Sequence, residues 1–331
     1  MARTLGYRPN LAARYLASKK TLRISVNTLQ GTTSFWDEVR AGIHEEASSI
    51  LLENVEVQFR TYPGLGEGEE EAFEAAIQEK VDGIITFPSR PETLRPWIRR
   101  ASRAQIPVVC VATDAPNSGR LGIVAVDTLA SGSIAADLMG RFLANRTGSV
   151  AITVFDMAIT EHAEKYAAFE STLNSFYPNL QLLKPIEDHD VEKEAYRKCR
   201  KLFEECSDLA GIYVTTEASI PVLQAACDAN VLERLTVITT DLFPDLVPHI
   251  RSGAVVATIF QRPRAQGQMA LRLLHEFLAE GGGRRSHQVA LAPHLVMRGN
   301  LDFFLRRQSQ ESANKNGDSA RETRALMQDF A

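Results

Sequence analysis

The sequence predicts an α/β fold with two doubly wound, Rossmann-like lobes. Short apolar runs with the length of buried strands alternate with longer amphipathic segments along most of the chain. This alternation is typical of parallel sheets that are covered by helices on both faces. The candidate strands are too numerous for one open sheet, and 331 residues suffice for two domains of ordinary size. A (β/α)₈ barrel is the structural alternative, but the candidate strands outnumber those of a barrel.

Each expected strand is an apolar run, and an amphipathic segment follows it. The expected strands are LRISVNTL (22–29), VEVQF (55–59), VDGIITF (81–87), PVVCVA (107–112), GIVAV (122–126), SVAITVF (149–155), LQLLKPI (180–186), AGIYVTT (210–216), LTVITT (235–240) and VVATIF (255–260). The first helix is expected around Val39, Ile43 and Ala47, which recur at helical spacing. Further helices are expected over 69–80, 94–105, 130–144, 162–176, 192–206, 221–229 and 265–279. The polar segment 306–331 has few large apolar residues and is expected to be disordered.

Composition limits the possible partners and compartments. The formal net charge is −4, so any contact with nucleic acid must be local rather than spread over the whole surface. Four cysteines, Cys110, Cys199, Cys206 and Cys227, form no CxxC pair. We expect reduced, mostly buried thiols and a cytoplasmic location. We expect no membrane partner, because no apolar run is long enough to span a bilayer, and the basic N-terminus has no apolar signal core behind it.

Motifs for catalysis, cofactors and metals are missing from the sequence. There is no GxGxxG after the first strand, no Walker loop and no GxSxG elbow. The loop GLGEG (64–68) leads into an acidic run that would repel phosphate, and EDHDVEKE (187–194) has no recognised metal-ligand spacing. We therefore expect no enzyme activity, no cofactor and no metal.

Polar and aromatic residues gather instead where the expected strands end. Open parallel sheets bind ligands at the carboxyl ends of their strands. Phe35 and Trp36 follow the first strand, where they could stack on the apolar face of a ring, although either could pack into the core. Five later stretches that end in hydroxyls, acids or amides are VATDAP (111–116), VDT (126–128), VTTEAS (214–219), TTD (239–241) and IFQRP (259–263). Caps and turns explain any single one, but five that converge on one cleft predict a polyol site.

Segments that contain four of these stretches resemble the LacI/GalR family of bacterial transcription regulators. ITTDLFPDLVPHIRSGAVVATIFQRP (238–263) is similar to the family's strand, Asp, helix and "G…ATI.Q.P" signature, and PVVCVATDAP with GIVAVDTLASG is similar to its hinge-crossing strand pair. The resemblance covers roughly residues 3 to 305. It implies a type I periplasmic-binding-protein-like fold whose two lobes are joined by a three-strand hinge. The implied lobes are 21–126 with 262–290, and 127–261 with 291–305.

The opening segment resembles the family's junction between DNA-binding and effector domains. LGYRPNLAARYL (5–16) is similar to "GY.PN..AR.L", after which the family forms a short hinge helix in the minor groove. The resemblance implies that residues 1–20 are a remnant of the DNA-binding domain with this helix. It also implies that Asn10, Ala13 and Arg14 face DNA, and that Leu16 wedges between base steps. Almost all of the helix-turn-helix is absent from the sequence, so a DNA operator is expected only where the full protein supplies that motif.

The resemblance also implies a set of ligand-binding residues. Lys165 falls where an Arg is usual, Thr216 where an Asn is common, and Ala112 where many sugar binders have Asp. Asp127 either contacts the ligand or caps the following helix. The complete set is Phe35, Trp36, Asp114, Asp127, Lys165, Thr216, Asp241 and Gln261.

The expected function is therefore that of a ligand-responsive transcription regulator. It would bind a small effector, most simply a monosaccharide or derivative, between its lobes as a homodimer, and couple closure to DNA binding. A stand-alone sugar-binding protein for transport or chemosensing is the alternative, because it would share the whole fold and cleft.

Overall fold

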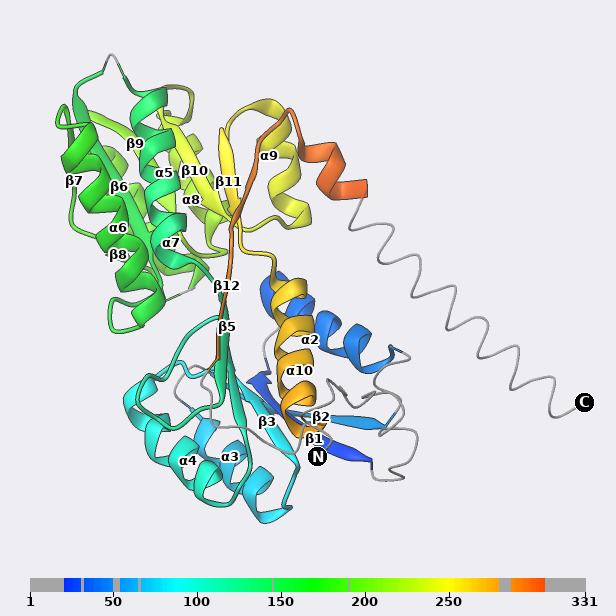
Figure 1. The fold of residues 1–331 in the computed structure, drawn as a ribbon. Helices are drawn as coiled ribbons and strands as arrows, with labels where there is room; N and C mark the ends of the chain where they lie inside the picture. The colour runs from blue at the N-terminus through cyan, green and yellow to red at the C-terminus, as the bar shows by residue number, and fades with distance from the viewer. Residues whose placement is uncertain are drawn as a thin grey trace, which may run out of the picture.

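A computed structural model describes residues 21–30, 33–49, 54–64, 67–144, 146–189, 191–279 and 287–306. These residues form two sheets, each flanked by helices, in two lobes (Figure 1). The expected pair of doubly wound lobes is confirmed, and the barrel alternative is wrong. Except for Arg306, the hinge helix expected within 1–20 and the tail expected over 306–331 lie outside the described residues.

The first lobe contains a parallel six-stranded sheet in the order β12-β5-β4-β3-β1-β2. Its strands are β1 (Leu22–Leu29), β2 (Val55–Tyr62), β3 (Gly83–Thr86), β4 (Val108–Val111), β5 (Gly122–Val126) and β12 (His287–Leu291). Helices α2 (Ser34–Ala47) and α10 (Pro263–Ala279) cover one face, and α3 (Glu69–Gln78) and α4 (Pro91–Arg103) cover the other. The edge strand β12 and the covering helix α10 both come from late in the chain.

The second lobe contains a seven-stranded sheet in the order β13-β11-β10-β9-β6-β7, with β8 paired to β6. Its strands are β6 (Gly148–Val154), β7 (Leu180–Leu182), β8 (Ile186–Glu187), β9 (Leu209–Val214), β10 (Thr236–Thr240), β11 (Ala257–Phe260) and β13 (His294–Val296), which is antiparallel to β11. Helices α5 (Thr128–Phe142) and α6 (Thr160–Phe176) cover one face, and α7 (Glu192–Glu205) and α8 (Ser219–Asp228) cover the other.

Strand β4 shows why such short apolar runs fold as two-sided strands. Side chains of a strand alternate between the faces of the sheet. Val109 and Val111 join the core under α2 and α10, whereas Val108 and Cys110 join the core under α3 and α4. A run with no polar residue is therefore what a central parallel strand requires.

Two glycines set the contact between α2 and α10. A Cβ atom on Gly42 would lie 2.0 Å from the Arg264 carbonyl oxygen, and one on Gly267 would lie 2.1 Å from the Val39 carbonyl oxygen. Because each glycine faces the backbone of the partner helix, the two helices approach more closely than side chains would permit. The late helix α10 is thereby fixed to the first lobe.

The chain crosses between the lobes at three places, which form the hinge (Figure 1). It crosses from β5 to α5 at Asp127, from β11 to α10 at Gln261 and Arg262, and from β12 to β13 at residues 292–293. Leu291 still pairs with Val126 in the first sheet, so β12 extends one residue past the boundary expected at 290.

Several short elements have no counterpart in the sequence expectations. They are β12, β13, two 3-10 helices at Leu232–Arg234 and Pro244–Leu246, and a helix over 301–306. The strand expected over 180–186 divides into β7 and β8, and α9 (Val247–Ser252) lies where the resemblance implied a helix after Asp241. The four cysteines are free, with Cys110 and Cys199 buried, Cys206 half-buried and Cys227 exposed. No helix among the described residues is long and apolar enough to cross a bilayer.

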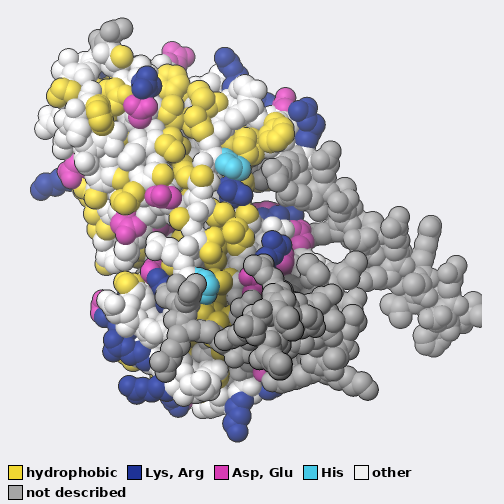
Figure 2. All heavy atoms as spheres, viewed as in Figure 1, with side chains coloured by type: hydrophobic (Ala, Val, Ile, Leu, Met, Phe, Trp, Pro, Cys, Tyr) yellow, Lys and Arg dark blue, Asp and Glu magenta, His cyan; other side chains and the backbone are white. Residues whose placement is uncertain are grey.

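Positive charge collects locally on the first lobe. Figure 2 shows Lys and Arg side chains at its lower left, over α3 and α4. Helix α4 contributes exposed Arg99, Arg100 and Arg103. This concentration contrasts with the net charge of −4 for the whole chain.

The glycine contact between α2 and α10 predicts a steric effect on stability. Gly42→Ala and Gly267→Ala should each lower the free energy of unfolding by about 1–3 kcal/mol, because the added methyl group meets backbone. Gly299→Ala is the control, since nothing lies within 4 Å of its Cβ position. It should stay within about 0.5 kcal/mol of the parent chain. Urea unfolding measures all three, and equal stability of the three variants would contradict the close contact.

Candidate functional site

Two cavities lie where the lobes meet. The first, which we call the interlobe cleft, measures about 370 Å³ and is lined by Leu29, Thr33, Phe35, Trp36, Phe87, Ala112, Phe155, Ile159, Glu161, His162, His189, Thr215, Thr216, Glu217, Asp241 and Gln261. The second, the hinge-side cavity, measures about 380 Å³ and is lined by residues of β5, β12 and the starts of α5 and α6. The interlobe cleft lies at the carboxyl ends of strands from both sheets, where open parallel sheets bind ligands.

Aromatic rings form walls on both sides of the interlobe cleft. In the first lobe, Trp36 packs edge-on between Phe35 and Phe87, with ring centroids 4.8 and 4.1 Å away. Trp36 is only 8% exposed and belongs to the core, so Phe35 is the more available of the adjacent pair. In the second lobe, the Phe155 ring lies 6.1 Å from that of His162. A flat ring with apolar faces would find aromatic contacts from both lobes.

A chain of buried hydrogen bonds forms the polar side of the cleft. The Asp241 carboxylate accepts from the backbone N–H of Gln261 at 3.0 Å and from its Nε2 at 2.6 Å. The Gln261 Oε1 accepts from the Lys165 Nζ at 2.8 Å, and Lys165 also donates to Glu161 at 2.5 Å. Lys165 is fully buried and is not part of the cleft lining. Its positive charge therefore acts on the cleft through Glu161 and Gln261.

The pKa values in this chain follow from burial and pairing. Burial raises the pKa of Asp241 to about 6, although its two bonds from Gln261 oppose the shift. Burial lowers the pKa of Lys165, but the Glu161 carboxylate outweighs this effect and the net shift is upward. Burial also lowers the pKa of His162 to about 4, so this ring is neutral near pH 7.

Two cleft residues hold a left-handed backbone conformation directly after a strand. Ala112 follows β4 with φ of 64°, and Asp241 follows β10 with φ of 64°. Their backbone N–H groups still bond to the next strands, at Val124 and Ile259. Such conformations are disfavoured for residues with a Cβ and collect at functional sites. At Asp241 the turn sends the chain away from the sheet while the carboxylate reaches back to Gln261.

Glu217 connects the two lobes. Its carboxylate accepts from the backbone N–H groups of Ser34 at 3.1 Å and Phe35 at 2.6 Å, in the first turn of α2. Thr33, the N-cap residue of α2, makes no side-chain cap bond. A carboxylate from the second lobe therefore serves as the cap of a helix in the first, and favours the arrangement in which the lobes are in contact.

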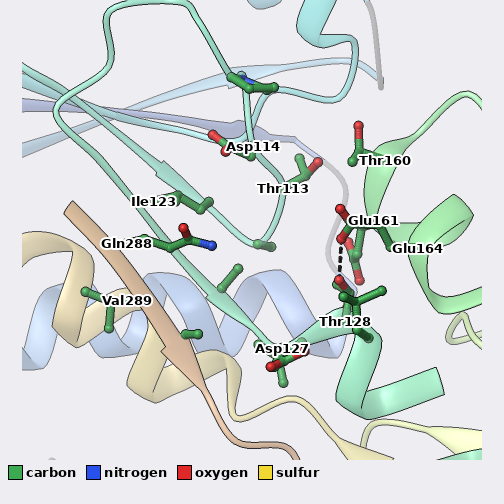
Figure 3. A pocket seen from close by; sticks show the side chains of 16 residues that line it. Thr113, Asp114, Ile123, Asp127, Thr128, Thr160, Glu161, Glu164, Gln288 and Val289 are labelled. Atoms are coloured by element: carbon green, nitrogen blue, oxygen red, sulfur yellow. Dashed lines mark hydrogen bonds between the residues drawn. The ribbon is translucent and has the colours of Figure 1, made fainter. Parts of the chain in front are cut away.

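The hinge-side cavity has a different lining (Figure 3). Asp114 forms an ion pair with Arg120, and Asp127 caps α5 by accepting from the backbone N–H of Ala130 at 2.9 Å. The Thr128 hydroxyl bonds to the Glu164 carboxylate across the starts of α5 and α6. An apolar floor comes from the sheet edge at β5 and β12. The described residues contain no group of three or more potential metal ligands.

The structure divides the predicted ligand-binding residues into three groups. Phe35, Trp36, Thr216, Asp241 and Gln261 line the interlobe cleft. Asp114 and Asp127 line the hinge-side cavity instead, with Asp127 acting as a helix cap. Lys165 lies behind the cleft. The predicted DNA-contacting residues Asn10, Ala13, Arg14 and Leu16 lie outside the described residues. Ligand contact by these residues stays a prediction.

The structure adds cleft residues that sequence reasoning did not single out. Phe87 and Phe155 follow buried strands, as do the predicted residues, so their position at a strand end was an available signal. Glu217 lies in the stretch VTTEAS (214–219), which was predicted to reach the cleft, although the residue itself was not in the predicted ligand set. Glu161 and His162 lie in the first turn of α6, and no pattern in the sequence showed that this turn faces the cleft.

Comparison with known proteins identifies a family with which the chain shares its sequence pattern. The family described as "Periplasmic binding protein domain" matches residues 24–283. The chain is 24% identical to the catabolite control protein A of Staphylococcus aureus over 279 residues, which are 83% of this chain and 80% of that protein.

Solved structures give the same result. A glucose-galactose binding protein, GanP, from Geobacillus stearothermophilus has a TM-score of 0.77 at 20% identity, over 86% of this chain and 99% of that one. A solute-binding protein of an ABC transporter from Bacillus halodurans, with bound myo-inositol, has a TM-score of 0.78 at 16% identity, over 87% and 98%. At these identities the likeness shows the fold.

The raised pKa of Asp241 predicts a pH-dependent cost to stability. Between about pH 4 and 6 the folded state binds more protons at this site than the unfolded state, so its contribution to stability falls as pH rises. Asp241→Asn removes the titration. The stability of this variant relative to the parent should therefore improve from pH 4 to pH 7, by on the order of 1–3 kcal/mol.

Urea unfolding at several pH values measures this change. Thr239→Val is the matched control, because it alters a buried side chain of the same strand, β10, without removing a titrating group. Its effect should be the same at each pH. A constant difference for Asp241→Asn would show that the carboxyl group does not titrate in this range.

The bond from Glu217 to α2 predicts an effect on both stability and shape. Glu217→Ala should cost about 1 kcal/mol of stability, as loss of a helix cap does, and should enlarge the radius of gyration in solution scattering. Glu233→Ala, at an exposed position of the same lobe, should change neither quantity. If the two variants behave alike, Glu217 does not hold the lobes together.

Proposed function

We propose that this chain, which belongs to the family of the periplasmic binding protein domain, is the effector-binding part of a transcription regulator that binds a neutral sugar between its lobes. The observation that carries the proposal is the interlobe cleft, where the Asp241 and Gln261 pair lies beside aromatic walls from both lobes. A sugar ring has apolar faces and a hydroxyl edge, which match these two kinds of surface.

The charge of the cleft favours a neutral ligand over a phosphorylated one. Carboxylates of Glu161, Glu217 and Asp241 line it, and the Lys165 ammonium is already bonded to Glu161 and Gln261. An anionic group would meet repulsion there, whereas hydroxyls can donate to the carboxylates. The names of GanP and of the protein with bound myo-inositol, a glucose-galactose binder and a polyol complex, support the same class of ligand.

The proposed mechanism is a two-state movement about the hinge. Ligand contacts from both lobes exist together only when the cleft is closed, so binding shifts the population toward that form. The hinge segment takes part directly, because Gln261 bonds to Asp241 one residue before the chain turns toward α10. Closure would then move the first lobes of a homodimer relative to each other. The segment before residue 21 in each chain would move with its lobe.

Regulation is supported by two observations. The chain is similar to a catabolite control protein over four-fifths of that protein, and the segment GYRPNLAARYL (6–16) resembles the junction that precedes an effector domain. A cytoplasmic location, a homodimer and a DNA operator are parts of the same proposal. Binding, rather than catalysis, is the proposed activity.

A stand-alone solute-binding protein is the second candidate. It is favoured by the TM-scores of 0.77 and 0.78 with transport-type binding proteins, which match almost their whole length to this chain. The two candidates differ in the partner that they bind besides the sugar, which is DNA for the regulator and a transport or chemosensing protein for the solute-binding protein. If the regulator assignment holds, the protein expressed from its gene should shift a DNA fragment from its own locus, and sugar should change that shift.

The sugar assignment predicts ligand stabilisation. A monosaccharide or polyol at about a hundred times its Kd should stabilise the chain by roughly 2.7 kcal/mol, which is a rise of about 5–10 °C in Tm. The panel includes glucose, galactose, arabinose, myo-inositol and a sugar phosphate. Asp241→Ala should abolish the rise by removing an acceptor in the cleft.

Asp302→Ala is the control, because Asp302 pairs with Arg251 on the surface of the second lobe and should leave the rise intact. If folded protein responds to none of the neutral sugars, the sugar assignment is wrong. If it responds only to the sugar phosphate, the charge argument is wrong.

A further inference from the structure

The interlobe cleft and the hinge-side cavity share two wall residues. Ala112 comes from the end of β4 in the first lobe, and Glu161 from the first turn of α6 in the second. Ala112 contributes only a methyl group where the cavities meet. The Glu161 carboxylate is held toward the buried ammonium of Lys165, 2.5 Å away. The two cavities are therefore adjacent, with these two residues between them.

A buried hydroxyl in the hinge-side cavity lacks a partner. Thr113 is 2% exposed, and its Oγ1 makes no hydrogen bond within the part of the chain that the structure describes. Figure 3 shows this side chain at the cavity, with its oxygen on the side of Thr160 and Glu161 at the start of α6. Buried hydroxyls are normally bonded, because an unpaired one is costly. In this arrangement of the lobes the Oγ1 atom has no surface open to the cavity, so a ligand hydroxyl would supply the missing bond only after the Thr113 side chain turned toward the cavity.

The carboxylates of the hinge-side cavity are already matched with donors. Asp114 pairs with Arg120, Asp127 accepts from a backbone N–H of α5, and Glu164 accepts from Thr128. Only Asp114 has a charged partner, so Asp127 and Glu164 keep their negative charge and would repel an anion. A carboxylate has about four lone-pair sites, so each can still accept a bond from a ligand hydroxyl.

The rest of the lining suits the other side of a sugar ring. Ile123 and Ala125 of β5 and Ala290 of β12 present apolar surface on one face of the sheet edge, and Gln288 adds an amide. The cavity thus combines an apolar floor with a rim of oxygen acceptors and one amide, the pattern that hydroxyl-rich rings require.

We propose that the hinge-side cavity is a second sugar subsite. The preferred ligand is a disaccharide or glycoside, with one unit in the interlobe cleft, the other in the hinge-side cavity, and the linkage between Ala112 and Glu161. This inference rests on the proposed sugar binding and extends it. Ligand pockets span roughly 300–1,000 Å³, so a cavity of about 370 Å³ is at the small end. Together with the neighbouring 380 Å³, the space reaches the upper half of that range.

The second subsite also bears on closure. Its walls come from the first lobe at Thr113 and β12, and from the second lobe at Leu129, Thr160 and Glu164. A unit bound there touches both lobes on the hinge side of the molecule. A two-unit ligand therefore gains contacts that a single unit lacks, and these contacts favour the closed form further.

Titration calorimetry of the full chain tests the subsite. The probes are glucose and galactose, and the disaccharides maltose, cellobiose, lactose and melibiose. Ala290→Trp places an indole in the hinge-side cavity from an exposed position of the edge strand β12. Gln181→Trp is the matched control, because it is exposed on the edge strand β7 of the other sheet. Thr113→Val removes only the hydroxyl and keeps the shape of the side chain.

The expected result is that one disaccharide binds at least about tenfold more tightly than its component monosaccharide, because it buries a second ring. Ala290→Trp should erase that advantage and leave monosaccharide affinity within about twofold, and Gln181→Trp should change neither. Thr113→Val should weaken the disaccharide alone by about three- to tenfold. If Ala290→Trp loses its fold by circular dichroism, Thr113→Val decides.

Two other outcomes separate this inference from the proposed function. If a monosaccharide binds as tightly as every disaccharide, and the variants at Ala290 and Thr113 change nothing, the second subsite is refuted and sugar binding in the interlobe cleft stands. If folded protein binds none of the six sugars, the subsite is refuted, and the proposed sugar function is refuted with it when arabinose and myo-inositol also give no response.

Discussion

The buried ammonium of Lys165 is the constraint around which the meeting of the lobes is organised. A charged group that is removed from water must be paired and hydrogen-bonded, because the free-energy cost of its desolvation otherwise exceeds the gain from the ion pair. Glu161, one helical turn earlier in α6, supplies the opposite charge, and Gln261 supplies a neutral acceptor. Gln261 in turn bonds to Asp241 with both its backbone and side-chain N–H groups. This sequence of bonds ties a helix, a strand end and a hinge crossing into one unit.

The consequence for binding is that the polar side of the cleft is built before a ligand arrives. Asp241 and Gln261 hold each other in place, so a ligand does not have to order them. The aromatic side is equally fixed, because Trp36 packs between Phe35 and Phe87 in the core of the first lobe. The remaining freedom lies in the distance between the lobes, which Glu217 restrains through α2. Each lobe carries a pre-formed wall of the cleft, and the lobes move relative to each other. In such an arrangement the closed form indicates that a ligand is bound.

The sequence predicted the fold well because alternating apolar runs and amphipathic segments reflect local requirements. β1 has the bounds expected from LRISVNTL, and α6 differs from its expected range by only two residues. Asp241 and Gln261 could be predicted as site residues for the same reason, since each follows a buried strand. Asp114 and Lys165 were harder to place, because the surroundings of Asp114 depend on how the turn after it folds, and those of Lys165 depend on its depth in the lobe. Nothing near Asp114 indicates that Arg120 folds back to bind it, and a Lys on a helix is usually solvated rather than fully buried. The missed edge strands β12 and β13 are short and half-polar, and only their neighbours in the sheet make them strands.

The late position of α10 and β12 in the chain has a consequence for biosynthesis. The apolar face of the first sheet is covered in part by Ala270, Leu271, Leu274 and Leu291, which the ribosome makes only after the whole of β6 to β11. The first lobe therefore leaves the exit tunnel with one face of its sheet covered only by α2 and with β5 as an unpaired edge. It stays in that condition while the second lobe is translated, because domains fold as their segments emerge. The nascent chain exposes this apolar surface for the time needed to add well over a hundred residues, and so presents chaperones with a defined target whose lifetime is set by the rate of translation.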